Sequence, residues 1–177
     1  MEIGGARAGA KSAKALAASA MFAALIFVSI TLLGIPNGIG GFIHFGDALV
    51  FTAACLLPFP YGLMVAAVGP GLFNLARAPM WLPFTLLIKP LMALCFTSKG
   101  EKILGSARNI AAPFAAAAIN IVLYFFAGAF LFGGWAAGAA GLWGDLIQGA
   151  GSIAFFFAIA AALDRAGIKA RLFKFPR

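Results

Sequence analysis

The chain alternates between long apolar runs and short breaks rich in glycine, proline or charge. The apolar runs cover residues 14–34, 46–58, 61–78, 83–97, 110–132 and 143–163. A helix needs about 20 apolar residues to cross a bilayer squarely, and the runs 46–58 and 83–97 are short for that. Irregular backbone at membrane depth is tolerated only where protein or a water-filled cavity encloses it. The pattern therefore predicts six membrane helices, two of which are short and indicate a cavity.

The breaks between the runs have the composition of turns and loops. They cover residues 35–41, 58–62, 78–83 and 133–141. The last of these consists mainly of glycine and alanine, and we expect it to be a loop. No repeat between the two halves of the sequence is evident.

The composition agrees with a membrane protein. Of the 177 residues, 63% are hydrophobic and 10% are charged, whereas soluble domains carry about 25% charged residues. A soluble fold of this length has too much surface to hide so many apolar side chains. The first run follows Arg7, Lys11 and Lys14, as in a signal peptide, but it is too long for such a peptide, so we expect it to be a retained span.

The net charge of +8 has its source in three segments that flank the runs. Eleven of the 13 Lys and Arg lie in the N-terminal tail, between the fourth and fifth runs, or in the C-terminal tail; Arg77 and Lys89 lie elsewhere. An even number of spans places these segments on one side of the membrane, and the positive-inside rule makes that side cytoplasmic. Basic patches with interleaved aromatics, typical of nucleic-acid binding, are absent from the sequence.

We therefore predict an all-α integral membrane protein, a bundle of six transmembrane helices with cytoplasmic N- and C-termini. It forms a single domain over residues 1–177, with cytoplasmic tails at 1–13 and 164–177. Cys55 and Cys95 lie inside apolar runs and are expected to be small buried hydrophobes. Since no other Cys or His is close to either in sequence, we expect no disulfide and no metal or other cofactor.

Polar residues within the runs gather in the predicted outer half of the membrane, where charged groups usually face a bundle interior or a pathway. We take them, with one tryptophan, as candidate substrate-binding residues: Asp47, Asn74, Trp81, Lys89, Asn120, Tyr124, Asp145 and Gln148. Lys89 is expected to pair with Asp47 or Asp145. The pair is either a structural ion pair with a snorkelling lysine or, as we favour, part of a pocket open to the exterior.

Three further features complete the candidate site. Trp81, Trp135 and Trp143 form either an interfacial belt or a stacking wall for a planar ligand. The stretch GGFIHFGD at 40–47 is expected to be an exterior loop that ends at a helix N-terminus, where a carboxylate is favoured. Its glycines permit close backbone approach, so the loop is suited to closing over an outer pocket.

The first run carries a strip of small residues. Ala13, Ala17, Ala20 and Ala24 are spaced at intervals of three or four residues, which permits close approach of another helix. The sequence leaves open whether that helix belongs to this bundle or to a partner subunit.

Several segments resemble the substrate-binding S components of energy-coupling factor (ECF) transporters, in particular the riboflavin- and hydroxymethylpyrimidine-carrier group. The resemblance covers residues 14–155 and rests on the order and spacing of AALIFVSITLLGIP, FGDALVFTAACLLPFPYG, VGPGLFNLARAP, LPFTLLIKPLMAL and GDLIQ. Three positions depart from the group's pattern: Asn74 replaces a frequent acid, and Pro58 and Pro90 replace glycines. These departures bear on the substrate rather than on the fold.

The resemblance implies a six-helix protein of the prokaryotic plasma membrane that captures a vitamin-like micronutrient for uptake. Its partners would be a transmembrane coupling subunit and two ATPase subunits, which bind the ATP. Gly40, Gly41, His44 and Asp47 would form the gate over the pocket, and Ala20 and Ala24 would contact the coupling subunit. A flat heteroaromatic substrate is expected, such as riboflavin, a pyrimidine, a pyridoxine-type vitamin or a deazaguanine base.

Other functions fit the sequence less well. An intramembrane enzyme would need a Ser–His pair, a cluster of metal ligands or an aspartate cluster, none of which the sequence offers. A stand-alone secondary carrier is the main alternative, but paired half-repeats with broken helices are not evident. If the candidate site is a pocket, Asp47→Ala and Lys89→Ala should weaken ligand binding in a protein that remains folded.

Overall fold

The computed structural model describes residues 3–37 and 40–172. The elements in chain order are α1 (Ile3–Leu33), β1 (Ile35–Pro36), β2 (Phe42–Ile43), α2 (Gly46–Leu56), α3 (Tyr61–Arg77), the 3-10 helix η1 (Pro79–Trp81), α4 (Leu82–Leu94), α5 (Ala107–Phe132), α6 (Trp135–Arg165) and α7 (Ile168–Leu172). The strands β1 and β2 form one small antiparallel hairpin. The predicted all-α class fits this arrangement.

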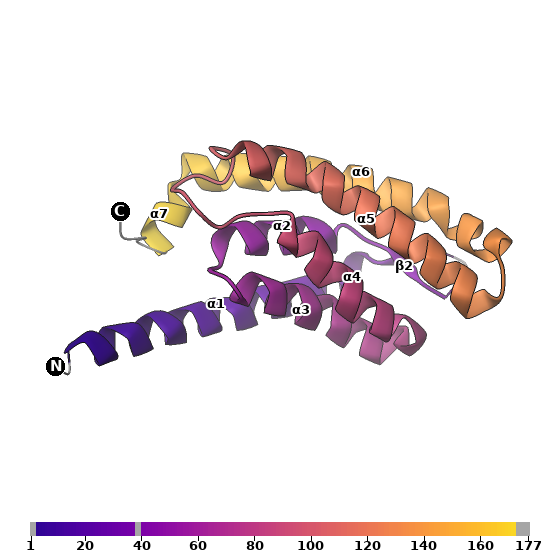
Figure 1. Ribbon diagram of the computed structural model, residues 1–177, viewed down its shortest axis with the longest axis horizontal. Helices are drawn as coiled ribbons and strands as arrows, with labels where there is room; N and C mark the ends of the chain where they lie inside the picture. The colour runs from indigo at the N-terminus through magenta and orange to yellow at the C-terminus, as the bar shows by residue number, and fades with distance from the viewer. Residues whose placement is uncertain (1–2, 38–39, 173–177) are drawn as a thin grey trace.

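The helices form two layers with α2 between them (Figure 1). The long helices α5 and α6 pack side by side in one layer, and α1, α3 and α4 form the other. The short helix α2 packs against α1, α3, α4 and α6, and every one of its residues except Leu49 is buried. The centre of the bundle is therefore a helix of 11 residues that is almost completely enclosed by protein.

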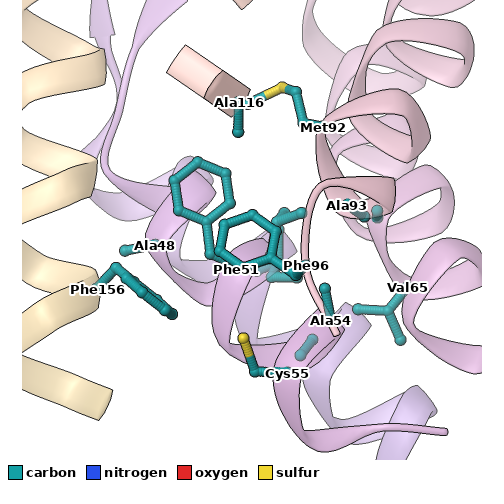
Figure 2. Close-up of a cluster of buried hydrophobic side chains, with 14 of the residues drawn as sticks. Ala48, Phe51, Ala54, Cys55, Val65, Met92, Ala93, Phe96, Ala116 and Phe156 are labelled. Carbon is teal, nitrogen blue, oxygen red and sulfur yellow. The ribbon is translucent and has the colours of Figure 1, made fainter. Parts of the chain in front are cut away.

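Aromatic side chains from three segments form the core beside α2 (Figure 2). Phe51 stacks on Phe96 with ring centroids 4.9 Å apart, and Phe156 meets both rings edge-on. Such pairs add about 0.5–1.5 kcal/mol each beyond the area they bury. Cys55 is completely buried in the same cluster, which confirms the expectation of a small core residue, whereas Cys95 is only half-buried.

Three helices in the described part of the chain are long and apolar enough to cross a membrane: residues Ser12–Leu33 of α1, together with α5 and α6. The helices α2, α3 and α4 have 11, 17 and 13 residues, fewer than the roughly 20 that a square crossing requires. The expectation that the second and fourth apolar runs form short helices is confirmed. The six-span arrangement stays a prediction.

The expected loop at residues 133–141 is wrong. Gly133, with a φ of 74°, ends α5, and α6 begins at Trp135. Gly138 is buried against α5 so closely that a Cβ there would lie 2.5 Å from the Phe125 carbonyl oxygen. Small residues that read as a loop in sequence thus form a helix–helix contact, as they do between membrane helices.

The start of α1, helix α7 and the linker between α4 and α5 lie at one end of the bundle, away from the β1–β2 hairpin (Figure 1). Helix α1 begins at Ile3, so much of the expected N-terminal tail is helical. The expected C-terminal tail begins in the last turn of α6 and includes α7; residues 1–2 and 173–177 lie outside the described part.

Side chains from α5 and α6 hold the α4–α5 linker in place. The buried Asn109 accepts a bond from the Thr97 N–H and donates to the Thr97 and Ile103 carbonyls. Both carboxylate oxygens of Asp164 accept backbone N–H groups, from Ile103 and Leu104. The linker is therefore a defined part of the bundle, although it has no regular secondary structure.

Candidate functional site

A cavity lies at the hairpin end of the bundle, between the hairpin and helices α3, α4, α5 and α6. Its empty volume is about 590 Å³, part of which is open to the outside. Four aromatic side chains contribute to its wall: Phe42, Phe73, Trp81 and Tyr124. Aromatic walls with a few polar groups are typical of small-molecule sites.

Six of the eight predicted binding residues line this cavity: Asn74, Trp81, Lys89, Tyr124, Asp145 and Gln148. They come from five elements, α3, η1, α4, α5 and α6. Asp47 and Asn120 do not line the cavity. They lie behind its wall and hold Lys89.

Lys89 is the centre of a buried polar network. Its Nζ lies 2.7 and 2.9 Å from the two carboxylate oxygens of Asp47, and 2.9 Å from Oδ1 of Asn120. Of the two possible partners, the structure therefore selects Asp47. The Lys89 ammonium also lies 5.4 Å from the centre of the Tyr124 ring, which favours a cation–π contact. The positive charge of Lys89 is thus compensated inside the wall.

Gln148 connects this network to the hairpin. Its Nε2 donates to Asp47 at 2.8 Å, and its Oε1 accepts the backbone N–H of His44 at 3.1 Å. One side chain of α6 thereby joins α2 to the segment that follows β2. A bonded chain of this kind fixes the relative positions of the elements that surround the cavity.

A second chain of hydrogen bonds runs along the opposite wall. Asn74 Nδ2 donates to Thr85 Oγ1 at 2.5 Å, and Thr85 Oγ1 lies 2.6 Å from the Tyr124 hydroxyl. Asp145, in contrast, makes no hydrogen bond or salt bridge with any other described residue. Its half-buried carboxylate is therefore available to accept a hydrogen bond from a ligand.

Of the predicted gate residues, Gly41 and His44 line the cavity, and Gly40 does not. Gly40 has a φ of 75°, which suits glycine, and its carbonyl accepts a bond from Trp81 Nε1 at 3.0 Å. Gly41 lines the cavity and donates its N–H to Asn37 Oδ1. The stretch that we expected to be a loop thus contains strand β2 and is joined to the wall through Trp81.

His44 lies between β2 and α2, outside the helices, and it lines the cavity. Its Nδ1 accepts the N–H of Gly46 at 3.2 Å. Burial away from water lowers the pKa of the His44 ring from 6.5 to about 4, against the opposing effect of Asp47. The ring is therefore neutral near pH 7, with its proton on Nε2, where it can donate to a ligand.

Residues 10–165 match the family model described as "ECF-type riboflavin transporter, S component". The chain belongs to this ECF S-component family. A comparison with curated proteins found no match. The S components are substrate-binding parts of transporters, and they are not a class of enzymes. The resemblance seen in the sequence is confirmed.

The cavity of this S component includes residues that the sequence analysis did not select: Asn37, Phe42, Phe73 and Thr85. Thr85 precedes Lys89 by four residues, so both lie on one helix face, and this spacing was a usable signal. Phe42 and Phe73 meet edge-on with centroids 5.1 Å apart, but no spacing rule relates a strand residue to a distant helix.

Of the two roles considered for the three tryptophans, a stacking wall formed by all three does not occur. Only Trp81 lines the cavity, whereas the side chains of Trp135 and Trp143 are 68% and 76% exposed. Trp135 instead stacks on Phe125 at the surface of the bundle. Arg77, at the end of α3, is also exposed and does not line the cavity.

The alanine strip of α1 faces outward. Ala13, Ala17, Ala20 and Ala24 are all exposed, whereas Ala23 and Ile26 make the contacts with the bundle interior. Of the two possibilities that the sequence left open, packing of this strip inside the bundle does not occur in the described part of the chain. The strip is free to contact another molecule.

The Trp81–Gly40 bond leads to a testable prediction. Trp81→Phe keeps an aromatic ring in the wall but removes the bond that joins it to the hairpin. A hydrogen bond contributes about 1 kcal/mol net, so ligand affinity should fall about five-fold, mainly through faster dissociation. Stopped-flow fluorescence with a bound ligand would measure this. The exposed Trp143→Phe is the matched control, and equal dissociation rates in the two variants would contradict the prediction.

Proposed function

We propose that this protein is the substrate-capture subunit of an ECF-type importer and binds a vitamin-like heteroaromatic micronutrient in the hairpin-end cavity. One observation carries the proposal: a member of the S-component family holds a cavity that combines an aromatic wall with hydrogen-bonding groups still available to a ligand. A planar ring would lie against Trp81 and Phe73. Asn74, Tyr124, Asp145, Gln148 and Lys89 are the polar groups around it.

The substrate is a flat molecule with N–H or O–H donors directed toward Asp145. Riboflavin, which the family's description names, satisfies this requirement through its ribityl hydroxyls and its ring N–H. An aminopyrimidine, a pyridoxine-type vitamin and a deazaguanine base satisfy it as well. Asp47 and Asn120 contribute indirectly, since they position Lys89.

In the proposed orientation six helices cross the cell membrane of a prokaryote and both termini are cytoplasmic. The grouping of basic residues in the tails and the linker supports this orientation, because the start of α1, the α4–α5 linker and helix α7 share one end of the bundle. The cavity then opens to the exterior, and Gly40, Gly41 and His44 belong to its gate. The protein would receive energy from a coupling subunit and two ATPase subunits, with Ala20 and Ala24 as docking residues.

The first test is mass spectrometry of the purified, denatured protein for a co-purified small molecule. A stoichiometric heteroaromatic compound would support the proposal and name the substrate. If none is found, a thermal-shift screen with riboflavin, pyrimidines, pyridoxine and deazaguanines follows. Failure of every compound to raise the melting temperature would count against the binding function.

Uptake measurements separate the proposed subunit from a stand-alone carrier. Proteoliposomes that contain this chain alone should bind the ligand without accumulating it. Accumulation should require the ECF module and internal ATP. ATP-independent accumulation by the isolated chain would favour the secondary carrier.

A further inference from the structure

A second hollow lies at the opposite end of the bundle, between the α2–α3 turn, the end of α4 and the α4–α5 linker. Its empty volume of about 620 Å³ includes space open to solvent, and it shares no lining residue with the hairpin-end cavity. We call it the linker groove. Its apolar part is formed by Leu57, Phe59, Leu63, Leu94 and Phe96. Phe59 is 75% exposed and Leu94 is 47% exposed, so the apolar part is accessible from outside.

The rim of the linker groove is basic. Lys99 and Arg108 line it, next to Thr97 and Ser98. The guanidinium of Arg108 is exposed, yet it is held in place because its Nε and Nη2 donate to the Cys95 and Leu94 carbonyls. An arginine has five N–H donors, so Arg108 presents a fixed charge with further donors directed away from these carbonyls.

The backbone at Lys99 is also fixed. Its N–H donates to Thr97 Oγ1 at 3.3 Å, and its carbonyl accepts a bond from Lys169 Nζ at 3.3 Å. The exposed Lys99 side chain therefore stands at a defined place on the rim. Two cationic residues held in place by hydrogen bonds thus lie next to an exposed apolar surface. This combination is complementary to an amphiphile with a negative head group.

No acidic residue in the described part of the chain lines the linker groove. Both oxygens of the Asp164 carboxylate accept backbone bonds within the linker. Glu101 is exposed on the linker and does not line the groove. The charge facing a ligand in the groove is therefore positive.

We propose that the linker groove binds an anionic phospholipid. Its phosphate lies between Lys99 and Arg108, and one acyl chain lies along Phe59 and Leu94. Basic sites beside membrane helices recognise lipid head groups in this way, and each Lys or Arg adds attraction to an anionic membrane. The apolar part of the groove favours a lipid over a soluble phosphate, because inorganic phosphate has no apolar group to bind there.

The test uses the full chain in detergent and two lipids with identical acyl chains, phosphatidylglycerol and phosphatidylcholine, with binding followed by native mass spectrometry. Phosphatidylglycerol should bind more tightly. Lys99→Ala and Arg108→Gln should each weaken its binding about five-fold, the effect of roughly one surface charge. Lys102→Ala is the matched control, because Lys102 is an exposed cation of the same linker that does not line the groove. If Arg108→Gln fails to fold, Lys99→Ala still decides the matter.

Several results would overturn the proposal. Equal binding of the two lipids would do so, as would an equal loss in Lys102→Ala, which would indicate attraction to general surface charge. Competition by inorganic phosphate would indicate a soluble-anion site. If Lys99→Ala spared lipid selectivity but lost association with a coupling subunit, the groove would be a protein contact. None of these outcomes depends on the vitamin-binding proposal.

Discussion

Lys89→Met is expected to lower the free energy of unfolding by about 3–5 kcal/mol, the usual cost of breaking a buried ion pair. The substitution leaves the Asp47 carboxylate, which is 2% exposed, with only the Gln148 amide as partner. Asn120 loses its bond to the ammonium as well. Unfolding in detergent, followed by circular dichroism against added SDS, measures the effect.

The double variant Asp47→Asn/Lys89→Met should recover most of this loss, because no charge is then left buried. Lys102→Met, at an exposed position, is the control and should change little. Similar stability of Lys89→Met and the native protein would mean that water reaches Asp47. The structure thus revises the sequence-based expectation of folded Lys89→Ala and Asp47→Ala proteins: binding measurements on these single variants would mix folding with affinity.

Ala20→Trp and Ala24→Trp are each expected to reduce the rate of coupled uptake at least about ten-fold. Ligand affinity should stay at its native value. The two alanines lie on the outer face of α1, and neither lines the hairpin-end cavity. A large ring on this face would keep a partner helix from the close approach that small residues permit. Uptake into proteoliposomes with the ECF module and ligand binding in detergent are measured on the same preparations.

Leu25→Trp is the control for size and hydrophobicity. Leu25 is 50% exposed and lies about 100° around the helix from Ala24, so it is outside the alanine strip. It should transport normally. Normal uptake in Ala20→Trp and Ala24→Trp would refute the docking role, and equal loss in all three variants would point to a general defect of α1.

Hydropathy was sufficient to locate the six main helices, though not all of their ends, because burial in lipid and burial in protein both select apolar residues. The predicted loop at 133–141 was wrong because small residues serve two different structures. Gly138 permits close contact with α5, and composition alone does not distinguish such a helix contact from a loop. The helix start at Ile3 was missed for a related reason, since polar residues before Lys14 do not stop a helix.

Six residues of the cavity were predicted because polar groups within an apolar run usually face the interior of a bundle or a pathway. That argument cannot separate a residue in the wall from one behind it. Asp47 and Asn120 satisfy it as well as Tyr124 does, although only Tyr124 reaches the cavity. Phe42 and Phe73 carried no signal, because an apolar side chain in a membrane protein gives no hint of its neighbours.

Helix α2 has a consequence for anyone who wishes to change the specificity of this protein. Within 11 residues it holds both the carboxylate that positions Lys89 and the Phe51 ring of the core, and it has almost no free face to absorb a substitution. Asn74, Thr85 and Asp145 instead reach the cavity from helices that pack against α2, and Tyr124 reaches it from α5. A mutant library that varies these four residues and leaves α2 intact could be screened for binding of other ligands without disrupting the fold.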